Sequence, residues 1–173
     1  MKIWIYADCH IGTTDTLKEL ELNPDYDMCL KFIEMVKREK PDYVISLGDF
    51  TEQIWDNIQI LNVAHGDIIA KMLQVTNRFL PGNHDPGDGG IIEMEGIQFL
   101  HGHQWERASD GFVERLHKKA NTQNKYTVIA HSHIPENGDN FMAVGSLTLT
   151  GTFGEIDGSI KRIRTIPKEG VMA

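Results

Sequence analysis

Short apolar runs alternate with longer amphipathic segments in the first half of the chain. The runs Ile3–Ala7, Tyr43–Leu47 and Arg78–Leu80 are typical of buried strands. Between them, apolar residues recur at helical spacing from Met28 to Val36 and again from Ile54 to Leu73. This order of strand, helix, strand, helix, strand predicts a parallel sheet with right-handed crossovers.

The second half of the chain is richer in predicted strands. One helix is expected from Ser109, as its cap, to Ala120, and Asp157-Gly158 predicts a type I′ turn between the last two strands. The expected strands are Ile91–Glu95, Ile97–Leu100, Tyr126–Ala130, Phe141–Val144, Ser146–Thr152, Phe153–Ile156 and Ile160–Ile166. The two halves together predict an α/β fold with two sheets packed face to face and helices outside.

Capping and helix-breaking residues set the expected limits of the first two helices. Asn23 before Pro24 predicts the start of the first helix, with proline in its first turn. Gly66 predicts an interruption of the second helix.

Composition places the chain among globular proteins. Its 173 residues are 40% hydrophobic and 24% charged, which suits one domain over residues 1–173. The net charge of −8 opposes binding to duplex nucleic acid. Cys9 and Cys29 are too few for a disulfide framework, and we recognise neither a signal peptide nor an apolar stretch of about 20 residues. We therefore expect a cytoplasmic protein with no membrane association.

Histidine, aspartate and asparagine side chains, which can bind metal ions, gather where the apolar strands end. Six of the eight histidines lie in such clusters, which together are Asp8-Cys9-His10, Gly48-Asp49, Gly82-Asn83-His84-Asp85, His101-Gly102-His103 and His131-Ser132-His133. Ligands of open α/β sheets bind at the carboxyl ends of strands, so these loops are expected to converge on one crevice.

The donor types in these clusters favour a metal site. In an extended segment, residues two apart face the same side, so Asp8 with His10 and His131 with His133 are expected to chelate in pairs. Carboxylate, imidazole and amide donors without a thiolate cluster suit manganese, iron, cobalt, nickel or zinc. Asp49 is the natural bridge between two ions, and open coordination positions would favour catalysis.

The order of these motifs resembles the calcineurin-like metallophosphoesterase superfamily. The motifs are Asp-x-His, Gly-Asp-x-x-Glu from Gly48 to Glu52, Gly-Asn-His-Asp, His-Gly-His and His-x-His. The resemblance implies a four-layer α/β/β/α sandwich of two mixed sheets flanked by helices. It also implies two divalent metal ions, of which manganese is our first choice: Asp8, His10 and His133 would hold one, Asn83, His101 and His131 the other, and Asp49 both.

The resemblance also implies a mechanism. A metal-bridging hydroxide would attack phosphorus in line, while His84 assists the leaving group and Asp85 orients His84. Glu52-Gln53 and Asp85 depart from the motifs of protein serine/threonine phosphatases. These departures argue against the protein phosphatase branch, and we expect no capping domain of the recombination-nuclease kind within 173 residues, so the chain resembles the small uncapped phosphodiesterase branch, acting on a phosphate ester.

Two other functions stay open at this point. One is a nuclease for short or single-stranded nucleic acid, against which the net charge argues only for duplexes. The other is a catalytically silent protein-interaction scaffold like the retromer subunit that resembles these enzymes. That branch has lost the histidine that corresponds to His84, which is present here. Small relatives often form dimers, so an edge strand or hairpin could mediate a homodimer.

Several residues near the motifs have two readings. His103 could face away from the metals or line the entrance, and Arg107 could contact phosphate or be a plain surface residue. Glu52 could support the metal site or stabilise a helix start. Trp55 and Trp105 suit packing better than substrate stacking. We expect the Cys9 side chain to lie in the core and, outside the motifs, His65 and His117 to lie in solvent.

Overall fold

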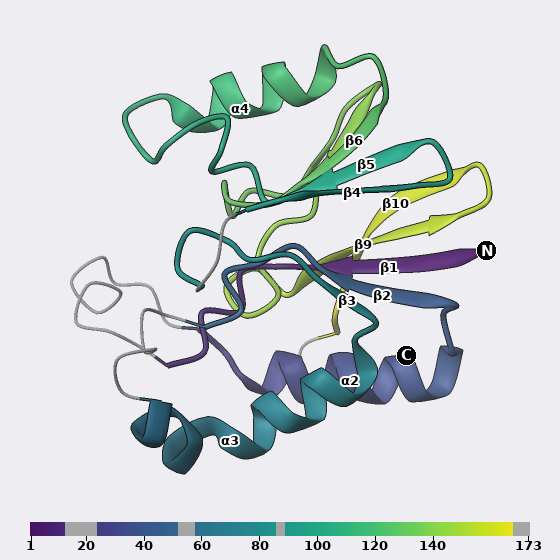
Figure 1. Ribbon diagram of the computed structural model, residues 1–173. Helices are drawn as coiled ribbons and strands as arrows, with labels where there is room; N and C mark the ends of the chain where they lie inside the picture. The colour runs from purple at the N-terminus through teal and green to yellow at the C-terminus, as the bar shows by residue number, and fades with distance from the viewer. Residues whose placement is uncertain (13–23, 52–57, 86–88, 168–173) are drawn as a thin grey trace.

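The computed structural model describes residues 1–12, 24–51, 58–85 and 89–167, and its strands form two five-stranded mixed sheets (Figure 1). The first sheet has the order β10-β9-β1-β2-β3. Its strands β1, β2 and β3 are parallel, and the β9–β10 hairpin joins β1 antiparallel. The bounds are β1 Lys2–Tyr6, β2 Tyr43–Ser46, β3 Arg78–Phe79, β9 Thr152–Asp157 and β10 Ile160–Thr165.

The second sheet has the order β4-β5-β6-β8-β7. Its central strands β5, β6 and β8 are parallel, and the edge strands β4 and β7 are antiparallel to their neighbours. The bounds are β4 Ile91–Met94, β5 Ile97–Leu100, β6 Tyr126–Ile129, β7 Glu136–Asn137 and β8 Phe141–Ala143.

Helices cover the outer face of each sheet. Helices α2 (Asp27–Glu39) and α3 (Ile58–Val75) lie together on the first sheet, and α4 (Phe112–Asn121) lies on the second (Figure 1). The layers therefore run α/β/β/α, which confirms the predicted fold class.

Strand β1 explains why the sandwich is stable. Trp4 and Tyr6 face the helices and pack with Phe32, whereas Ile3 and Ile5 face the second sheet. A strand buried on both faces needs an unbroken apolar run, as its sequence has. The same strand carries the first motif at its carboxyl end.

Two predicted helix starts are wrong by a few residues. Helix α2 begins at Asp27, so Pro24 precedes it, and the proposed cap Asn23 lies outside the described residues. Helix α4 begins at Phe112 because Gly111, at φ 74°, takes a left-handed conformation that interrupts any helix from Ser109.

Three further local predictions are corrected. Helix α3 runs without a break through Gly66, since an 18-residue helix tolerates the roughly 1 kcal/mol cost of one glycine; the predicted positions 54–57 lie outside the described residues. The segment 146–151 forms turns held by the Ser146 and Thr150 hydroxyls. The last hairpin turns at Gly158-Ser159, and a positive φ at the first of these two residues alone matches type II′.

Candidate metal centre

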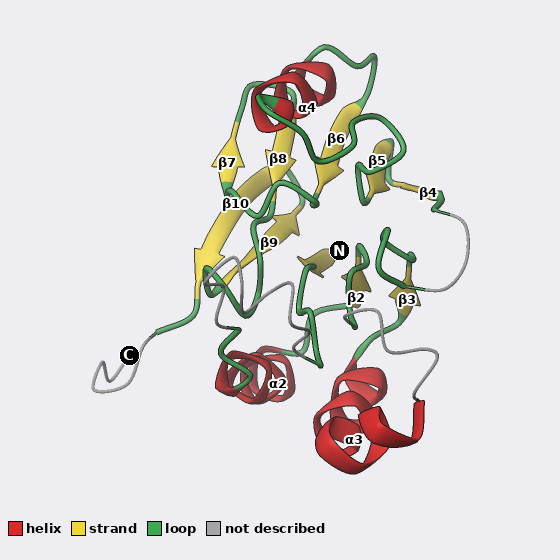
Figure 2. Ribbon diagram, turned by 90° about the vertical axis from the view of Figure 1, so that its left-hand side faces the viewer, coloured by secondary structure: helices red, strands yellow, loops and turns green. Residues whose placement is uncertain are grey.

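The predicted metal-binding residues follow the carboxyl ends of parallel strands in both sheets. The two sheets bring these ends to the same side of the molecule, where their loops face one another (Figure 2). Backbone hydrogen bonds join neighbouring loops, from Asp8 N to Gly48 O and from His10 N to Asp49 O, both at 2.9 Å. The loops that follow β1 and β2 therefore act as one support.

The backbone of this region is unusual. Five of the predicted ligands have positive φ, namely Asp8 (53°), His10 (46°), Asp49 (46°), His131 (68°) and His133 (60°). Such a conformation costs on the order of 1–3 kcal/mol at a residue with a side chain and is characteristic of functional sites. The paired residues thus reach the same side by left-handed turns, and the extended geometry that we expected for them is wrong.

The first group of donors consists of Asp8, His10 and His133, whose ligand atoms all lie within 4.8 Å of one another. The Nε2 atoms of His10 and His133 are 2.9 Å apart, and Asp8 Oδ1 is 3.7 and 3.6 Å from them. Asp8 and His10 are buried, and His133 is partly exposed. This arrangement matches the set predicted for one ion.

The second group consists of Asp49, His101 and His131, also within 4.8 Å. His101 Nε2 is 3.2 Å from Asp49 Oδ2 and 3.1 Å from Asn83 Oδ1. Asp49 Oδ2 is also 4.0 Å from His10 Nε2 and so connects the two groups. The other ring nitrogen of His101 is 2.8 Å from Leu47 O, which turns Nε2 towards the site.

Buried charge shifts the titration of these groups. Burial opposes ionisation of Asp8 and Asp49, yet nearby histidines hold the pKa of both carboxyls below the ordinary value. Burial also disfavours the charged form of His101, but Asp49 and Asp8 raise its pKa to about 9. For His131, burial and the neighbouring His101 lower the pKa to about 4. In the metal-free protein these pKa shifts favour ionised Asp8 and Asp49, a protonated His101 and a neutral His131 at neutral pH.

The donor set fits divalent cations. Asp8 Oδ1 and His131 Nε2 are buried and have no hydrogen-bond partner in the described structure. Buried polar atoms are nearly always satisfied, so one unpartnered ligand atom in each donor group indicates a missing partner at each. Oxygen and imidazole donors without thiolate suit manganese, iron, cobalt, nickel and zinc.

His84 and Asp85 lie beside the two groups. The His84 N–H donates to Asp49 Oδ1 at 2.8 Å, and its ring lies edge-on to His10 with centroids 5.4 Å apart. The Asp85 carboxylate accepts hydrogen bonds from the Gly82 N–H and from the backbone and hydroxyl of Thr51. Asp85 therefore ties the β3 loop to the β2 loop.

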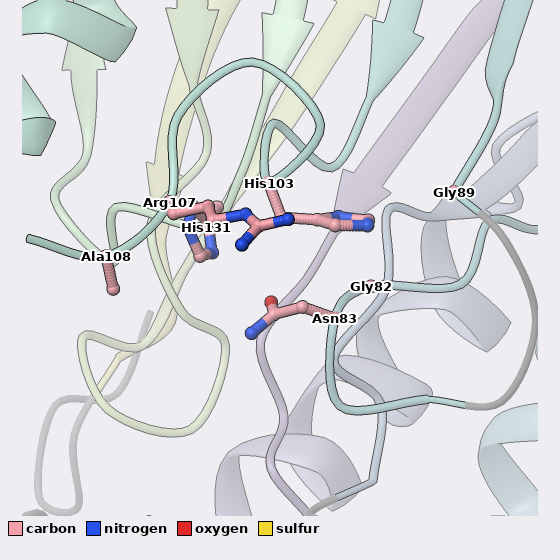
Figure 3. A pocket seen from close by; sticks show the side chains of 7 residues that line it. All are labelled: Gly82, Asn83, Gly89, His103, Arg107, Ala108 and His131. Atoms are coloured by element: carbon pink, nitrogen blue, oxygen red, sulfur yellow. The ribbon is translucent and has the colours of Figure 1, made fainter.

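A pocket of about 430 Å³ borders the second group (Figure 3). The side chains of Asn83, His103, Arg107 and His131 line it, and the Arg107 guanidinium extends over it. His103 thus lines the entrance, and burial lowers its pKa. Arg107 is exposed, and no hydrogen bond or ion pair of its side chain occurs within the described part of the chain.

The predicted exposure of His117 is wrong. The ring is buried and bonds to Ser132 and Glu136, because helix α4 turns it towards the sheet. His65 is half-buried against Tyr26. Trp105 packs against the buried apolar cluster between α4 and the second sheet, and Cys9 lies in the core. Glu52 and Trp55 lie outside the described residues.

Among the helices that the structure describes, none combines the length and apolar character that crossing a bilayer requires.

Solved structures with low sequence identity share this fold. YfcE, a phosphoesterase from E. coli, is 15% identical with a TM-score of 0.60, over 100% of this chain and 97% of YfcE. A double mutant of Vps29 from Entamoeba histolytica is 14% identical with a TM-score of 0.56, over 94% and 90%. A dimetal phosphatase from Danio rerio is 9% identical with a TM-score of 0.51, over 90% and 91%.

Sequence comparison leads to the family directly. No curated protein is similar enough in sequence to match this chain. The sequence model described as calcineurin-like phosphoesterase, however, matches residues 1–160. The chain therefore belongs to the calcineurin-like phosphoesterase family.

Proposed function

We propose that this protein is a phosphodiesterase that depends on two divalent metal ions. Asp8, His10 and His133 would hold one ion, Asn83, His101 and His131 the other, and Asp49 both. The observation that carries the proposal is the convergence of two three-residue donor groups joined by Asp49. When bound, such ions supply a nucleophile from water near neutral pH and neutralise charge on phosphoryl oxygens.

The protein's own residues prepare the remaining steps. His84 is held through its backbone by Asp49 and stands beside His10, outside both donor groups. It is therefore placed to give a proton to the departing ester oxygen. Asp85 positions His84 by fixing the backbone of the same loop to Gly82 and Thr51.

The pocket gives room for the organic part of an ester. Its volume of about 430 Å³ lies within the range of small-molecule sites, about 300–1,000 Å³. Arg107 offers a guanidinium at this pocket, where it would bind a phosphoryl oxygen of the substrate. Arg107→Ala is expected to raise KM for a phosphodiester more than it lowers kcat, as steady-state kinetics would measure.

Manganese is the ion that we propose, and iron, cobalt, nickel and zinc also suit these donors. We propose a cytoplasmic location, supported by the free thiols of Cys9 and Cys29, since reducing compartments keep thiols unpaired.

The nuclease and the scaffold are the alternative functions. The charge of −8 opposes duplex binding, and the retained donor groups and His84 give the scaffold no support.

A hydrolysis assay tests the proposal. Metal-free protein would be given Mn²⁺ and an aryl phosphodiester, with the matching monoester and single-stranded oligonucleotides as competing substrates. We expect diester turnover that a chelator abolishes and that Asp49→Asn lacks. Binding of Mn²⁺ without turnover of any ester would support the scaffold instead, and faster oligonucleotide cleavage would support the nuclease.

A further inference from the structure

A short chain of hydrogen bonds lies behind the metal centre. Glu136 Oε2 is 2.5 Å from His117 Nδ1, and His117 Nε2 is 2.8 Å from Ser132 Oγ. These three residues come from the edge strand β7, helix α4 and the loop after β6. The chain therefore joins the outer helix layer to a loop that carries two proposed ligands.

Ser132 occupies a special place in that loop. It stands between His131 and His133, which belong to different donor groups and both have positive φ. The Ser132 N–H bonds to Ala130 O at 2.8 Å, so the turn is tight as well as strained. A strained backbone persists only where its surroundings fix it, and the Ser132 hydroxyl is one such attachment.

The chemistry of His117 suits a tether. An ionised carboxylate only accepts hydrogen bonds, so Nδ1 carries a proton towards Glu136 and Nε2 is left to face Ser132. A neutral ring accepts the serine hydroxyl, and a charged ring donates to it. The contact with Ser132 is therefore kept in either protonation state.

The burial of His117 argues against a packing role alone. Besides His117, the buried residues of α4 are Leu116 and Ala120, both apolar. A polar ring at such a position loses hydration, which only good hydrogen bonds offset. The outer end of the chain, Glu136, has a side chain that is 54% exposed, so it adds little to the core.

A serine, a histidine and a glutamate in series also suggest a nucleophile. Ser132 is 6% exposed and does not line the pocket beside His131. Its hydroxyl also accepts the Ile134 N–H at 3.3 Å. With no access for a substrate, this geometry points to support of the loop.

We propose that Glu136 and His117 are positioning residues that act through Ser132. They hold the loop so that His131 and His133 present their imidazoles to two metal ions at once. This inference rests on the proposed function. Outer hydrogen-bond partners of metal ligands typically contribute about 10- to 100-fold to metal affinity.

The test compares variants of the three hydrogen-bonded residues by calorimetric titration of metal-free protein with Mn²⁺. We expect Ser132→Ala to weaken binding about 10- to 100-fold. Glu136→Ala, a change at an exposed side chain, should also weaken binding, and Glu136→Gln, which keeps an acceptor oxygen, should recover part of the loss. Lys118→Ala, on the exposed face of α4, is the matched control and should bind like the unaltered protein.

Thermal unfolding of the metal-free variants separates positioning from stability. We expect Glu136→Ala to melt with the Lys118→Ala control while binding Mn²⁺ more weakly. Unchanged affinity in Glu136→Ala and Ser132→Ala, in a protein that binds two ions, would overturn the positioning role alone. Failure of the unaltered protein to bind Mn²⁺ would overturn the proposed function, and this inference with it.

Discussion

At the scale of the residue, His84 is distinguished by its attachments. His10, His101, His131 and His133 belong to the two donor groups, whereas His84 is attached to the centre by its backbone N–H to Asp49 and by its ring against His10. Its side chain can therefore be removed without removing a proposed ligand.

This attachment gives the first prediction. His84→Ala should keep two ions per chain, measured by metal analysis, and lose turnover by about 100-fold or more because the leaving oxygen no longer receives a proton. Substrates with a good leaving group need less protonation and should lose less. Equal turnover of the variant and the unaltered protein would remove His84 from the mechanism.

His101 gives a second prediction, because its pKa of about 9 keeps it protonated in the metal-free protein at neutral pH. A metal ligand must be deprotonated, so ion binding should release about one proton from this residue. Calorimetry at pH 7.5 in buffers of different ionisation enthalpy would count it.

The sign of the same effect can be checked on stability. The raised pKa of His101 stabilises the metal-free fold fully below the unfolded value of about 6.5, and this contribution is lost as pH rises through about 9. The same proton competes with a metal ion for His101. Affinity for Mn²⁺ should therefore increase between pH 7 and 9, as His101 loses this proton. A pH-independent affinity would show that His101 is not a ligand.

Sequence reasoning at this scale identified side chains better than backbone. The types and strand-end positions of Asp8 and His10 pointed to a common site, but their left-handed φ depends on loops that meet only in the fold. The hydrogen bonds of His117 to Ser132 and Glu136 could not be predicted for the same reason, since these two residues come from other elements.

At the scale of the element, the ends of β2 and β3 touch through two glycines. A Cβ on Gly48, which has φ 104°, would lie 2.2 Å from Gly82 N. A Cβ on Gly82 would lie 2.2 Å from Asp49 Oδ1. The close approach of these two strand ends is therefore what lets Asp49 reach its position.

Gly82→Ala is consequently expected to displace the Asp49 carboxylate. We predict a loss of about 1–3 kcal/mol in the free energy of unfolding, from urea denaturation, together with weaker Mn²⁺ binding. The control is Gly96→Ala, which has φ 74° but open space around the new methyl group. It should lose stability through strain alone, and metal affinity equal in both variants would contradict this account.

The elements themselves were largely predictable because apolar periodicity reports burial. Strands β1, β2 and β6 coincide with the apolar runs that predicted them, and helix α2 coincides with its amphipathic segment. The start of α4 and the turns at 146–151 depended on backbone conformation and hydroxyl contacts, which periodicity does not contain.

At the scale of the whole molecule, an ionic network fastens the first sheet to α2. The buried Glu155 of β9 accepts hydrogen bonds from Trp4, Arg162 and Arg164, and Arg164 also binds Glu39. Burial alone would raise the pKa of Glu155, but these donors hold it below the ordinary value.

The network predicts how stability depends on acid. A depressed pKa means that Glu155 stabilises the fold above its unfolded pKa of about 4.3 and that this contribution is lost as pH falls further. Glu155→Gln should therefore be less stable than the unaltered protein at pH 7, with a smaller further loss between pH 5 and 3.5. Urea denaturation at these pH values would measure the difference, and parallel curves would contradict it.

The layered architecture followed from the order of strands and helices, whereas the partner of each strand did not. The pairing of Lys2 with Asp157 joins the beginning of the sequence to its last hairpin. An apolar run indicates that a strand is buried but carries no information about which strand pairs with it.

That long-range pairing has a consequence for when the site can exist. The Ser146 hydroxyl binds Asp8 O, the Thr148 hydroxyl binds Cys9 O, and β9 completes the sheet beside β1. The Asp8-Cys9-His10 motif thus acquires its shape from residues that follow it 138 positions or more along the sequence. A nascent chain that still lacks residues 146–157 lacks these contacts, so cation loading should await their synthesis.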